Sequence, residues 1–213
     1  MTYSVKEIFY TLQGEGAQTG RPAVFMRFAG CNLWSGLERD REAAQCQFCD
    51  TDFVGTDGTS GGKYKSAEQL AQTVLSQWPK NAHIKAKPLV VCTGGEPLLQ
   101  LDNDLIYELR AKGFEIAVES NGTVVAPKGI NWLTISPKAN CPLKQKSGDE
   151  LKLVYPQDQN QPKDFEDMDF KHLFLQPKDD ANHKDNIDKT IEYIKANPQW
   201  RLSLQTHKTT GIR

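Results

Sequence analysis

Short apolar segments alternate with amphipathic segments along most of the chain. Residues 88–92 (Pro-Leu-Val-Val-Cys) form an apolar run that is typical of a buried strand in a parallel sheet. Residues 114–118 (Phe-Glu-Ile-Ala-Val) form another, and similar runs recur toward the C-terminal end. The pattern predicts a series of strands separated by helices. The expected strands are residues 24–28, 88–92, 114–118, 132–135, 150–155, 172–175 and 200–204.

The segments between these runs carry helix start and stop signals. Ser66 begins a capping-box pattern, and the apolar residues that follow it share one helical face. Asp102 is a typical N-cap for a second helix, which Gly113 is expected to end. A third helix is expected at about residues 186–196, and a short one at residues 37–44.

Strands that alternate with helices indicate an α/β fold with parallel pairing and right-handed crossovers. About three good helices are too few for a complete eightfold barrel, so we expect an open or partial (β/α) barrel. With 213 residues the chain fits a single domain, residues 1–213, with a sizeable core. The glycine-rich stretch 54–62 is the clearest loop.

Polar or glycine-rich residues follow nearly every expected strand. The carboxyl ends of parallel strands meet at one edge of a sheet, where ligands of α/β proteins bind. We therefore expect these clusters to build one composite site. They are residues 29–31, 93–97, 119–122, 136–138, 176–179 and 205–208.

Charge and cysteine usage narrow the class of function. The 26 basic and 27 acidic side chains give a formal net charge of -1, so no nucleic-acid partner is expected. No run of about 18 apolar residues is present, so no membrane span is expected, and the N-terminus lacks the apolar core of a secretory signal. Five cysteines, an odd number, argue against a disulfide framework and for metal binding or catalysis in the cytoplasm.

Three of the cysteines lie close together in the sequence. Cys46 and Cys49 are separated by two residues, and Cys31 precedes them. Soft thiolates select zinc, copper(I) or iron–sulfur clusters. A structural zinc site normally takes a fourth protein ligand, and none is evident nearby. From spacing alone, zinc and a four-iron cluster with one open iron remain alternatives, as does a fortuitous grouping.

A wider set of motifs surrounds these cysteines. In chain order it is Leu-Gln-Gly-Glu-Gly (12–16), Arg-Phe-Ala-Gly-Cys (27–31), Cys-Asp-Thr (49–51), Thr-Gly-Gly-Glu-Pro-Leu (93–98) and Glu-Ser-Asn-Gly-Thr (119–123). The set resembles the 7-carboxy-7-deazaguanine synthase family of the radical S-adenosylmethionine (SAM) superfamily, which acts in queuosine and deazapurine biosynthesis. The commonest superfamily spacing is C-x3-C-x2-C, whereas here the first gap is an insertion of 14 residues, 32–45.

The resemblance implies that Cys31, Cys46 and Cys49 hold a [4Fe–4S] cluster whose open iron binds SAM. The radical chemistry then belongs to the cofactors, so no side chain is assigned to catalysis. The resemblance further implies a SAM site made of Phe48, Cys49, Asp50, Gly94, Gly95, Glu119, Ser120, Asn121, Ser136, Pro137, Lys138, Gln176, Pro177, Lys178 and Asp179.

Some of these positions also have simpler interpretations. Gly94 and Gly95 are typical of a tight turn that leads into a helix beginning at Pro97. Phe48 could pack in the core, and Asn121-Gly122 is an ordinary turn signal. Cys92 and Cys141 are not expected to be ligands.

The family's substrate is 6-carboxy-5,6,7,8-tetrahydropterin, which loses ammonia in a ring contraction that starts with hydrogen abstraction at C6. Gln13 or Glu15 could read its amino and ring N–H groups, and Arg27 could hold its carboxylate with two parallel hydrogen bonds. By resemblance, Thr51 binds Mg²⁺, a hard ion that keeps positions for substrate oxygens. The expected substrate site is Leu12, Gln13, Gly14, Glu15, Arg27, Thr93, His207 and Arg213.

These residues have alternative interpretations as well. Residues 13–16 could form a surface hairpin, Arg27 a strand ion pair, Thr51 a turn, and the chain end a frayed tail. Expected partners are the pterin, an electron donor such as flavodoxin or ferredoxin, and a second copy of the chain in a homodimer. Two other functions stay open: a glycyl-radical activating enzyme and a zinc-stabilised binding module.

Overall fold

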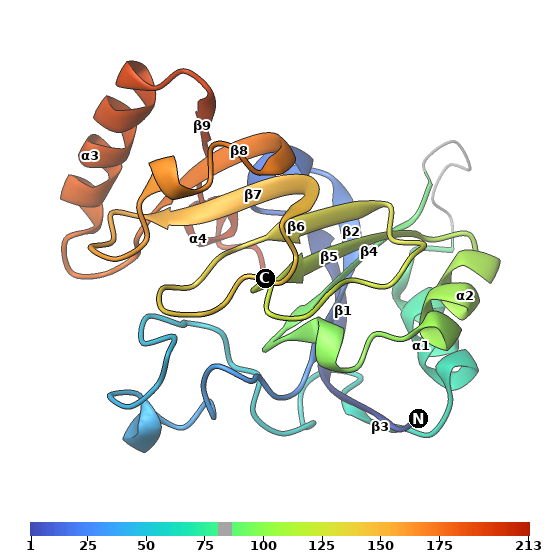
Figure 1. The fold of residues 1–213 in the computed structure, drawn as a ribbon. Helices are drawn as coiled ribbons and strands as arrows, with labels where there is room; N and C mark the ends of the chain where they lie inside the picture. The colour runs from blue at the N-terminus through green and yellow to red at the C-terminus, as the bar shows by residue number, and fades with distance from the viewer. Residues whose placement is uncertain (81–86) are drawn as a thin grey trace.

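The computed structural model, which describes residues 1–80 and 87–213, contains one nine-stranded sheet (Figure 1). The strand order is β3-β1-β2-β4-β5-β6-β7-β8-β9. The strands are β1 (Tyr3–Leu12), β2 (Pro22–Phe28), β3 (Gly62–Tyr64), β4 (Leu89–Gly94), β5 (Glu115–Ser120), β6 (Trp132–Ile135), β7 (Ser147–Tyr155), β8 (Asp169–Pro177) and β9 (Trp200–Leu202).

Strand β2 and the six strands β4 to β9 pair in parallel with their neighbours in this order, as the alternation of strands and helices predicts. They are the seven strands expected from the sequence, with bounds that differ by up to three residues. Two further strands were not predicted: β1 lies antiparallel to β2, and β3 lies antiparallel to β1. A register shift between Val5 and Glu7 interrupts the alternation in β1, which hides this strand in the sequence.

Three helices cover one side of the sheet: α1 (Ala67–Gln77), α2 (Asn103–Ala111) and α3 (His183–Ala196). The predicted start signals of α1 and α2 are confirmed, since Ser66 Oγ accepts from Gln69 N and Asp102 Oδ1 accepts from Leu105 N. A fourth helix, α4 (Thr206–Thr210), is short. The fold is thus α/β with an open sheet and few helices, which confirms the expected class.

The helix expected at residues 37–44 does not form. Only one 3-10 turn, η2 (Glu38–Asp40), is present there. Residues 38–42 (Glu-Arg-Asp-Arg-Glu) are all charged, so the segment has no apolar stripe that could stabilise a helix by packing. The other 3-10 turns are η1 (Gly16–Gln18), η3 (Pro97–Leu99) and η4 (Pro162–Asp164).

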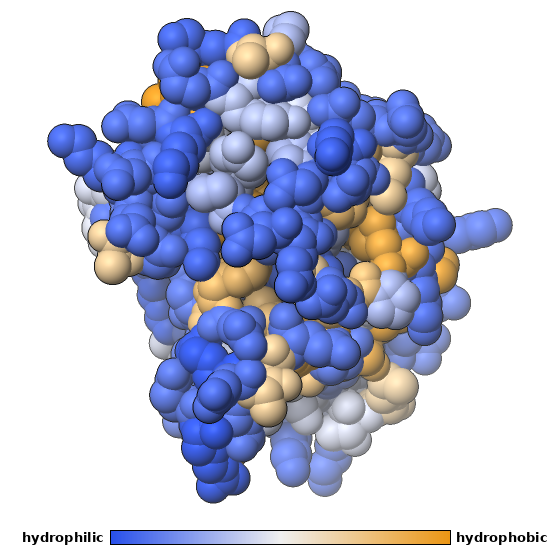
Figure 2. Space-filling model, turned by 60° about the vertical axis from the view of Figure 1, so that its left-hand side comes forward, coloured by the Kyte–Doolittle hydropathy of each residue, from blue (hydrophilic) through white to orange (hydrophobic). Residues whose placement is uncertain are grey.

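The core lies between the sheet and these helices. A large buried cluster joins β1, β2, β4, β5 and β6 to α1 and α2, and a smaller one joins β7 and β8 to α3. Hydrophilic residues dominate the face in Figure 2, with apolar side chains in separate small areas. Among the described residues, no helix is both long enough and apolar enough to cross a membrane.

Candidate functional site

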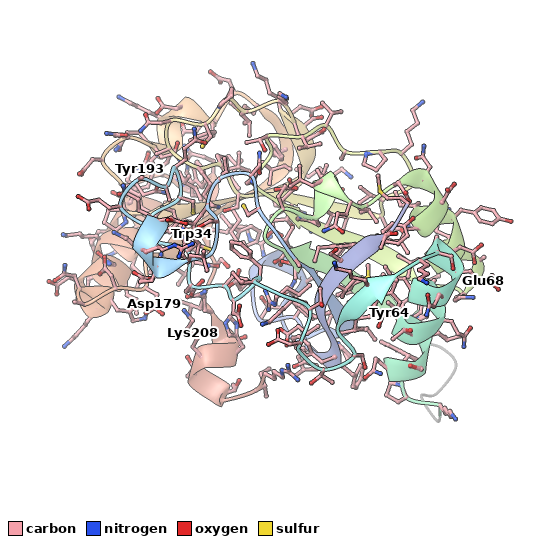
Figure 3. All side chains as sticks on the ribbon, turned by 90° about the horizontal axis from the view of Figure 1, so that it is seen from below. Trp34, Tyr64, Glu68, Asp179, Tyr193 and Lys208 are labelled. Carbon is pink, nitrogen blue, oxygen red and sulfur yellow. The ribbon has the colours of Figure 1, made fainter. Side chains whose placement is uncertain are left out.

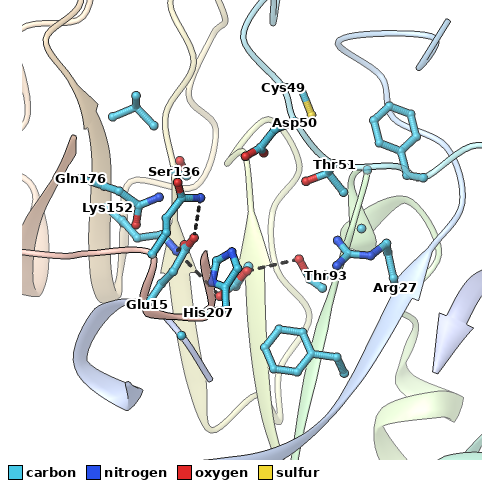
Figure 4. A pocket seen from close by; sticks show the side chains of 18 of the residues that line it. Glu15, Arg27, Cys49, Asp50, Thr51, Thr93, Ser136, Lys152, Gln176 and His207 are labelled. Atoms are coloured by element: carbon cyan, nitrogen blue, oxygen red, sulfur yellow. Dashed lines mark hydrogen bonds and ion pairs between the residues drawn. The ribbon is translucent and has the colours of Figure 1, made fainter. Parts of the chain in front are cut away.

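A cavity of about 430 Å³ lies at the carboxyl edge of the parallel strands (Figure 4). Strand register explains its lining. Arg27 pairs with Thr93, and Glu119 pairs with Thr134, so these four side chains share one layer and one face of the sheet. Of the site residues expected from the sequence, only Pro137 does not line this cavity; it is buried behind it, where its carbonyl accepts from Asn160 Nδ2 at 3.0 Å.

The three clustered cysteines all lie on the cavity wall. Cys46 is buried, Cys31 and Cys49 are half-buried, and each is a free thiol. Burial raises the pKa of Cys31, whereas a hydrogen bond with Cys46 lowers the pKa of Cys49 to about 6. Cys92 is buried in β4 and Cys141 lies outside the cavity lining, as expected of residues that are not ligands.

The donor set fits an iron–sulfur cluster with one open iron. Three soft thiols converge on one cavity, and no fourth cysteine lines it. Among the described residues, no three His, Cys, Asp or Glu side chains are grouped so as to hold a single metal ion.

The loop that carries these cysteines is organised around Trp34. Its ring packs edge-on against Phe53, with the ring centres 5.6 Å apart. The Arg41 guanidinium lies 4.1 Å from the Trp34 ring centre. Arg41 also donates hydrogen bonds to the carbonyl oxygens of Gln47 (2.9 Å) and Cys49 (3.0 Å). A residue of the insertion therefore fixes the backbone that carries the last two cysteines.

Gly94 and Gly95 line the cavity, and the structure gives a packing reason for both. Gly94 has φ +125°, and a Cβ there would lie 2.2 Å from the carbonyl oxygen of Phe28. A Cβ at Gly95 would lie 2.0 Å from the carbonyl oxygen of Gly30. The glycines are thus required for the close approach of β4 to the end of β2, whatever their contact with a ligand.

Glu96 is fully buried and organises the segment after β5. It accepts hydrogen bonds from Leu98 N (3.0 Å), Ser120 Oγ (2.8 Å) and Asn121 N (2.8 Å). Burial raises the pKa of this carboxyl. Asn121 Nδ2 also donates to Asn32 Oδ1 at 3.1 Å. The expected cofactor residues Ser120 and Asn121 therefore reach the cavity with hydrogen bonds already made within the protein.

The segments after β6 and β8 complete this side of the cavity. Lys138 donates to the carbonyl oxygen and hydroxyl of Ser136 at 2.8 and 2.7 Å, and burial lowers the pKa of its ammonium group. Apart from Pro137, the expected cofactor residues of these two segments line the cavity: Ser136, Lys138, Gln176, Pro177, Lys178 and Asp179. Phe48 and Asp50 of the cysteine loop line it as well.

Lys208 of α4 links two of these segments. Its ammonium group lies 2.6 Å from an Asp50 oxygen and 2.5 Å from an Asp179 oxygen. Figure 3 labels Lys208 and Asp179. Lys208 belongs to the expected polar cluster 205–208 but was not among the expected site residues.

The floor of the cavity carries a charged group centred on Lys152. The Lys152 ammonium group contacts Glu15 and lies 3.8 Å from Glu119. Glu119 also accepts from Gln13 Nε2 (2.9 Å) and Thr93 Oγ1 (3.2 Å). Lys152 was not among the expected site residues, although the alternation of Glu150 and Lys152 with Leu151 and Leu153 is a signal for an inward-facing polar pair.

The C-terminal segment closes the other side. Thr206 N donates to Gly14 O at 3.0 Å, and a Cβ at Gly14 would lie 2.6 Å from His207 Nδ1. Gly14 is therefore needed for His207 to approach this close. The chain end is docked and not frayed in this structure, since the Arg213 guanidinium lies 4.4 Å from the Phe9 ring centre and contacts Glu7.

Glu7 joins Arg213 to Arg27. Arg27 Nε donates to Glu7 Oε1 at 2.9 Å, so the strand ion pair considered in the sequence analysis is present. Arg27 nevertheless lines the cavity, as does Thr51 (Figure 4). The exposed Leu12 lines it as well. A cavity with thiols on one wall, a guanidinium on another and carboxylates on the floor can hold a flat anionic heterocycle beside a metal cofactor.

Comparison with known proteins gives a consistent set of relatives. The chain is 57% identical over 212 residues to 7-carboxy-7-deazaguanine synthase of Caulobacter vibrioides, and 55% identical over 212 residues to that of Burkholderia multivorans, with 100% of each chain covered in both cases. The crystal structure of QueE from Escherichia coli matches with a TM-score of 0.70 and 28% identity, covering 96% of this chain and 94% of that one. No family model matches.

Proposed function

The chain belongs to the 7-carboxy-7-deazaguanine synthase family, and we propose from this membership that it converts 6-carboxy-5,6,7,8-tetrahydropterin to 7-carboxy-7-deazaguanine with loss of ammonia. The observation that carries the proposal is one cavity that joins the three clustered thiols to Arg27 and Glu15. Cofactor ligands and groups suited to a carboxylated pterin share the same space, which a radical reaction on a bound substrate requires.

Cys31, Cys46 and Cys49 would hold the [4Fe–4S] cluster. When bound, the cluster and SAM supply a carbon-centred radical. The residues of this chain would bind, orient and shield the reactants. The segments after β4, β5, β6 and β8 line the cavity and would surround SAM, and Lys208 links the cysteine loop to the segment after β8 through Asp50 and Asp179. Exclusion of water and oxygen is the protein's main contribution to such chemistry.

The substrate would lie toward Arg27 and the C-terminal segment. One Arg27 nitrogen is engaged by Glu7, and the fork presents further N–H donors to a carboxylate. Thr51 would contribute one oxygen to Mg²⁺, which keeps several positions for water and substrate. This magnesium assignment rests on the resemblance of the Cys-Asp-Thr motif and on the position of Thr51 in the cavity lining.

We also propose that a flavodoxin or ferredoxin reduces the cluster and that the protein is a homodimer. Both proposals rest on the family resemblance.

Anaerobic reconstitution tests the function. Protein with a reducible cluster, given SAM, Mg²⁺, a reductant and the tetrahydropterin, is expected to form a deazapurine with the mass of 7-carboxy-7-deazaguanine. A reducible cluster without this product would overturn the substrate assignment. Colourless protein that contains zinc and no iron would overturn the cofactor assignment.

A further inference from the structure

Three carboxylates from different parts of the chain surround one buried lysine. Lys152 of β7 contacts Glu15, which follows β1, and lies 3.8 Å from Glu119 of β5. Its side chain is only 7% exposed. Glu150, two residues earlier on the same face of β7, is buried and accepts from Ala17 N at 2.9 Å. Lys152 therefore places one positive charge among these carboxylates.

Glu15 and Glu119 keep unused acceptor capacity that faces the cavity. Each oxygen of Glu15 has one partner, since Lys152 donates to Oε2 and Gln205 donates to Oε1 at 3.0 Å. Each oxygen of Glu119 also has one hydrogen-bond partner, either Gln13 or Thr93. A carboxylate offers about four lone-pair sites, so both groups can accept further N–H donors from a ligand.

The charge on Lys152 keeps Glu15 in the ionised form that only accepts hydrogen bonds. Burial alone would raise the pKa of Glu15, but the charge and hydrogen bond of Lys152 lower it. Burial opposes the charge on Lys152 as well, and the charges of Glu119, Glu15 and Glu150 override it and raise the pKa of the lysine. An ionised carboxylate can only accept, whereas a protonated one also donates.

Other charged groups lie near this cluster. His207 of α4 acts on Glu15 in the same direction as Lys152, and Lys138 of the segment after β6 interacts with Lys152 as a like charge. Lys152 makes the direct contact with Glu15, so its removal is expected to dominate the behaviour of that carboxylate.

We propose that Lys152 is a positioning residue that fixes Glu15 and Glu119 as a pair of hydrogen-bond acceptors, and that this pair makes the cavity select heterocycles with N–H donors along one edge. The proposal rests on the proposed function, because a pterin presents an amino group and ring N–H groups of this kind. Lys152 acts through the two carboxylates and not on the reacting atoms.

The test compares Lys152→Met and Lys152→Arg with the wild type, all with cluster, SAM and Mg²⁺. Lys171→Met is the matched control, because Lys171 is 71% exposed and pairs with Asp149 on the surface. Substrate dissociation constants are measured without reductant, so that no turnover occurs, and kcat and KM are measured with reductant over a range of pH.

Lys152→Met is expected to raise both the dissociation constant and KM by roughly tenfold or more, with a smaller change in kcat. The acid limb of its kcat/KM profile is expected to move to higher pH, because Glu15 no longer has a cation that lowers its pKa. Lys152→Arg should recover most of the affinity. Lys171→Met should behave as the wild type, and the SAM-dependent electron paramagnetic resonance signal should be the same in all four proteins.

Wild-type affinity and an unshifted acid limb in Lys152→Met would overturn the proposal. If Lys152→Met does not fold, the double variant Lys152→Met/Glu150→Gln takes its place, because it also removes one buried carboxylate that the lysine no longer compensates. The double variant is expected to show the same weakened substrate binding. Wild-type binding by the double variant would also overturn the proposal. A wild-type protein that makes no deazapurine would overturn the proposed function, whereas active wild type with unaffected Lys152 variants would overturn only the role of Lys152.

Discussion

Among single residues, the five cysteines divide by position. Cys31, Cys46 and Cys49 line the cavity, whereas Cys92 is buried in β4 and Cys141 lies outside the lining. A thiolate that ligates iron has no replacement among the described residues of this cavity, because no other cysteine lines it. Each of the three is therefore expected to be indispensable.

The variant Cys49→Ala tests this difference, with Cys141→Ala as its control. Cys49→Ala is expected to reconstitute with little iron and to lose turnover, because a three-ligand cluster cannot be held by two thiolates. Cys141→Ala should keep the iron content and activity of the wild type. Iron analysis and visible absorption measure both. Full iron content and activity in Cys49→Ala would contradict the ligand assignment.

Arg27 is the residue that we expect to bind the substrate carboxylate. Arg27→Lys keeps the charge but loses the planar fork, so kcat/KM is expected to fall roughly ten- to hundredfold. Arg21→Lys is the control, because Arg21 pairs with Glu115 at 2.5 Å and does not line the cavity. Steady-state kinetics on both variants give the comparison. Equal kcat/KM values for the two variants would contradict the assignment.

Among the structural elements, the cysteine loop owes its shape to side chains and not to a regular helix. Arg41 stacks on Trp34 and holds the carbonyl oxygens of Gln47 and Cys49. Arg41→Met is expected to speed the release of iron to a chelator by roughly tenfold, since hydrogen bonds from a charged donor contribute about 1.5–3 kcal/mol. Arg39→Met is the control, because Arg39 is 79% exposed. Equal release rates in the two variants would contradict the role of Arg41.

The short helix α4 is expected to depend on Lys208. This residue is the cation between Asp50 and Asp179, and its hydrogen bond lowers the pKa of Asp179. Lys208→Met leaves Asp50 and Asp179 without this cation, so backbone amide hydrogen exchange in residues 46–52 and in α4 should become a fewfold faster. The effect is small because such half-exposed pairs contribute about 1 kcal/mol or less. Lys195→Met, a change on the surface of α3, should leave exchange as in the wild type; unchanged exchange in Lys208→Met would contradict the link.

The sequence predicts helices and strands well where burial requires a regular pattern of apolar and polar residues. Strands β4 and β5 are buried over most of their length, so they appear as short apolar runs, and the caps at Ser66 and Asp102 are local signals. The strand β1 was missed because an edge region with a register shift has no regular period. The prediction of a helix at residues 37–44 was wrong because the charged residues 38–42 give the segment no apolar face to pack.

The sequence predicts which residues gather at the candidate site, but not which side chains contact one another there. Polar clusters after parallel strands meet at one edge by topology alone, which the cavity lining confirms. The partners of individual side chains were not predictable, because Lys152 meets Glu15 and Glu119 only through the pairing of distant strands. The packing requirement at Gly94 and Gly95 likewise depends on the backbone of β2, which the sequence does not reveal.

The whole molecule is an open sheet whose carboxyl edge is covered by two loop regions. The cysteine loop covers one side, and the C-terminal segment from Thr206 to Arg213 covers the other, where it contacts β1 and the residues that follow it. The two regions meet at the ion pair between Lys208 and Asp50. Between them lies the cavity of about 430 Å³, with Cys31, Cys46 and Cys49 on its wall.

Electron paramagnetic resonance of the reduced, anaerobically reconstituted protein, with and without SAM, tests the proposed cluster most directly. We predict the signal of a reduced [4Fe–4S] cluster whose g-values change when SAM is added, because the iron without a protein ligand accepts it. A signal that SAM leaves unaltered, or a preparation that binds no iron under these conditions, would contradict the account.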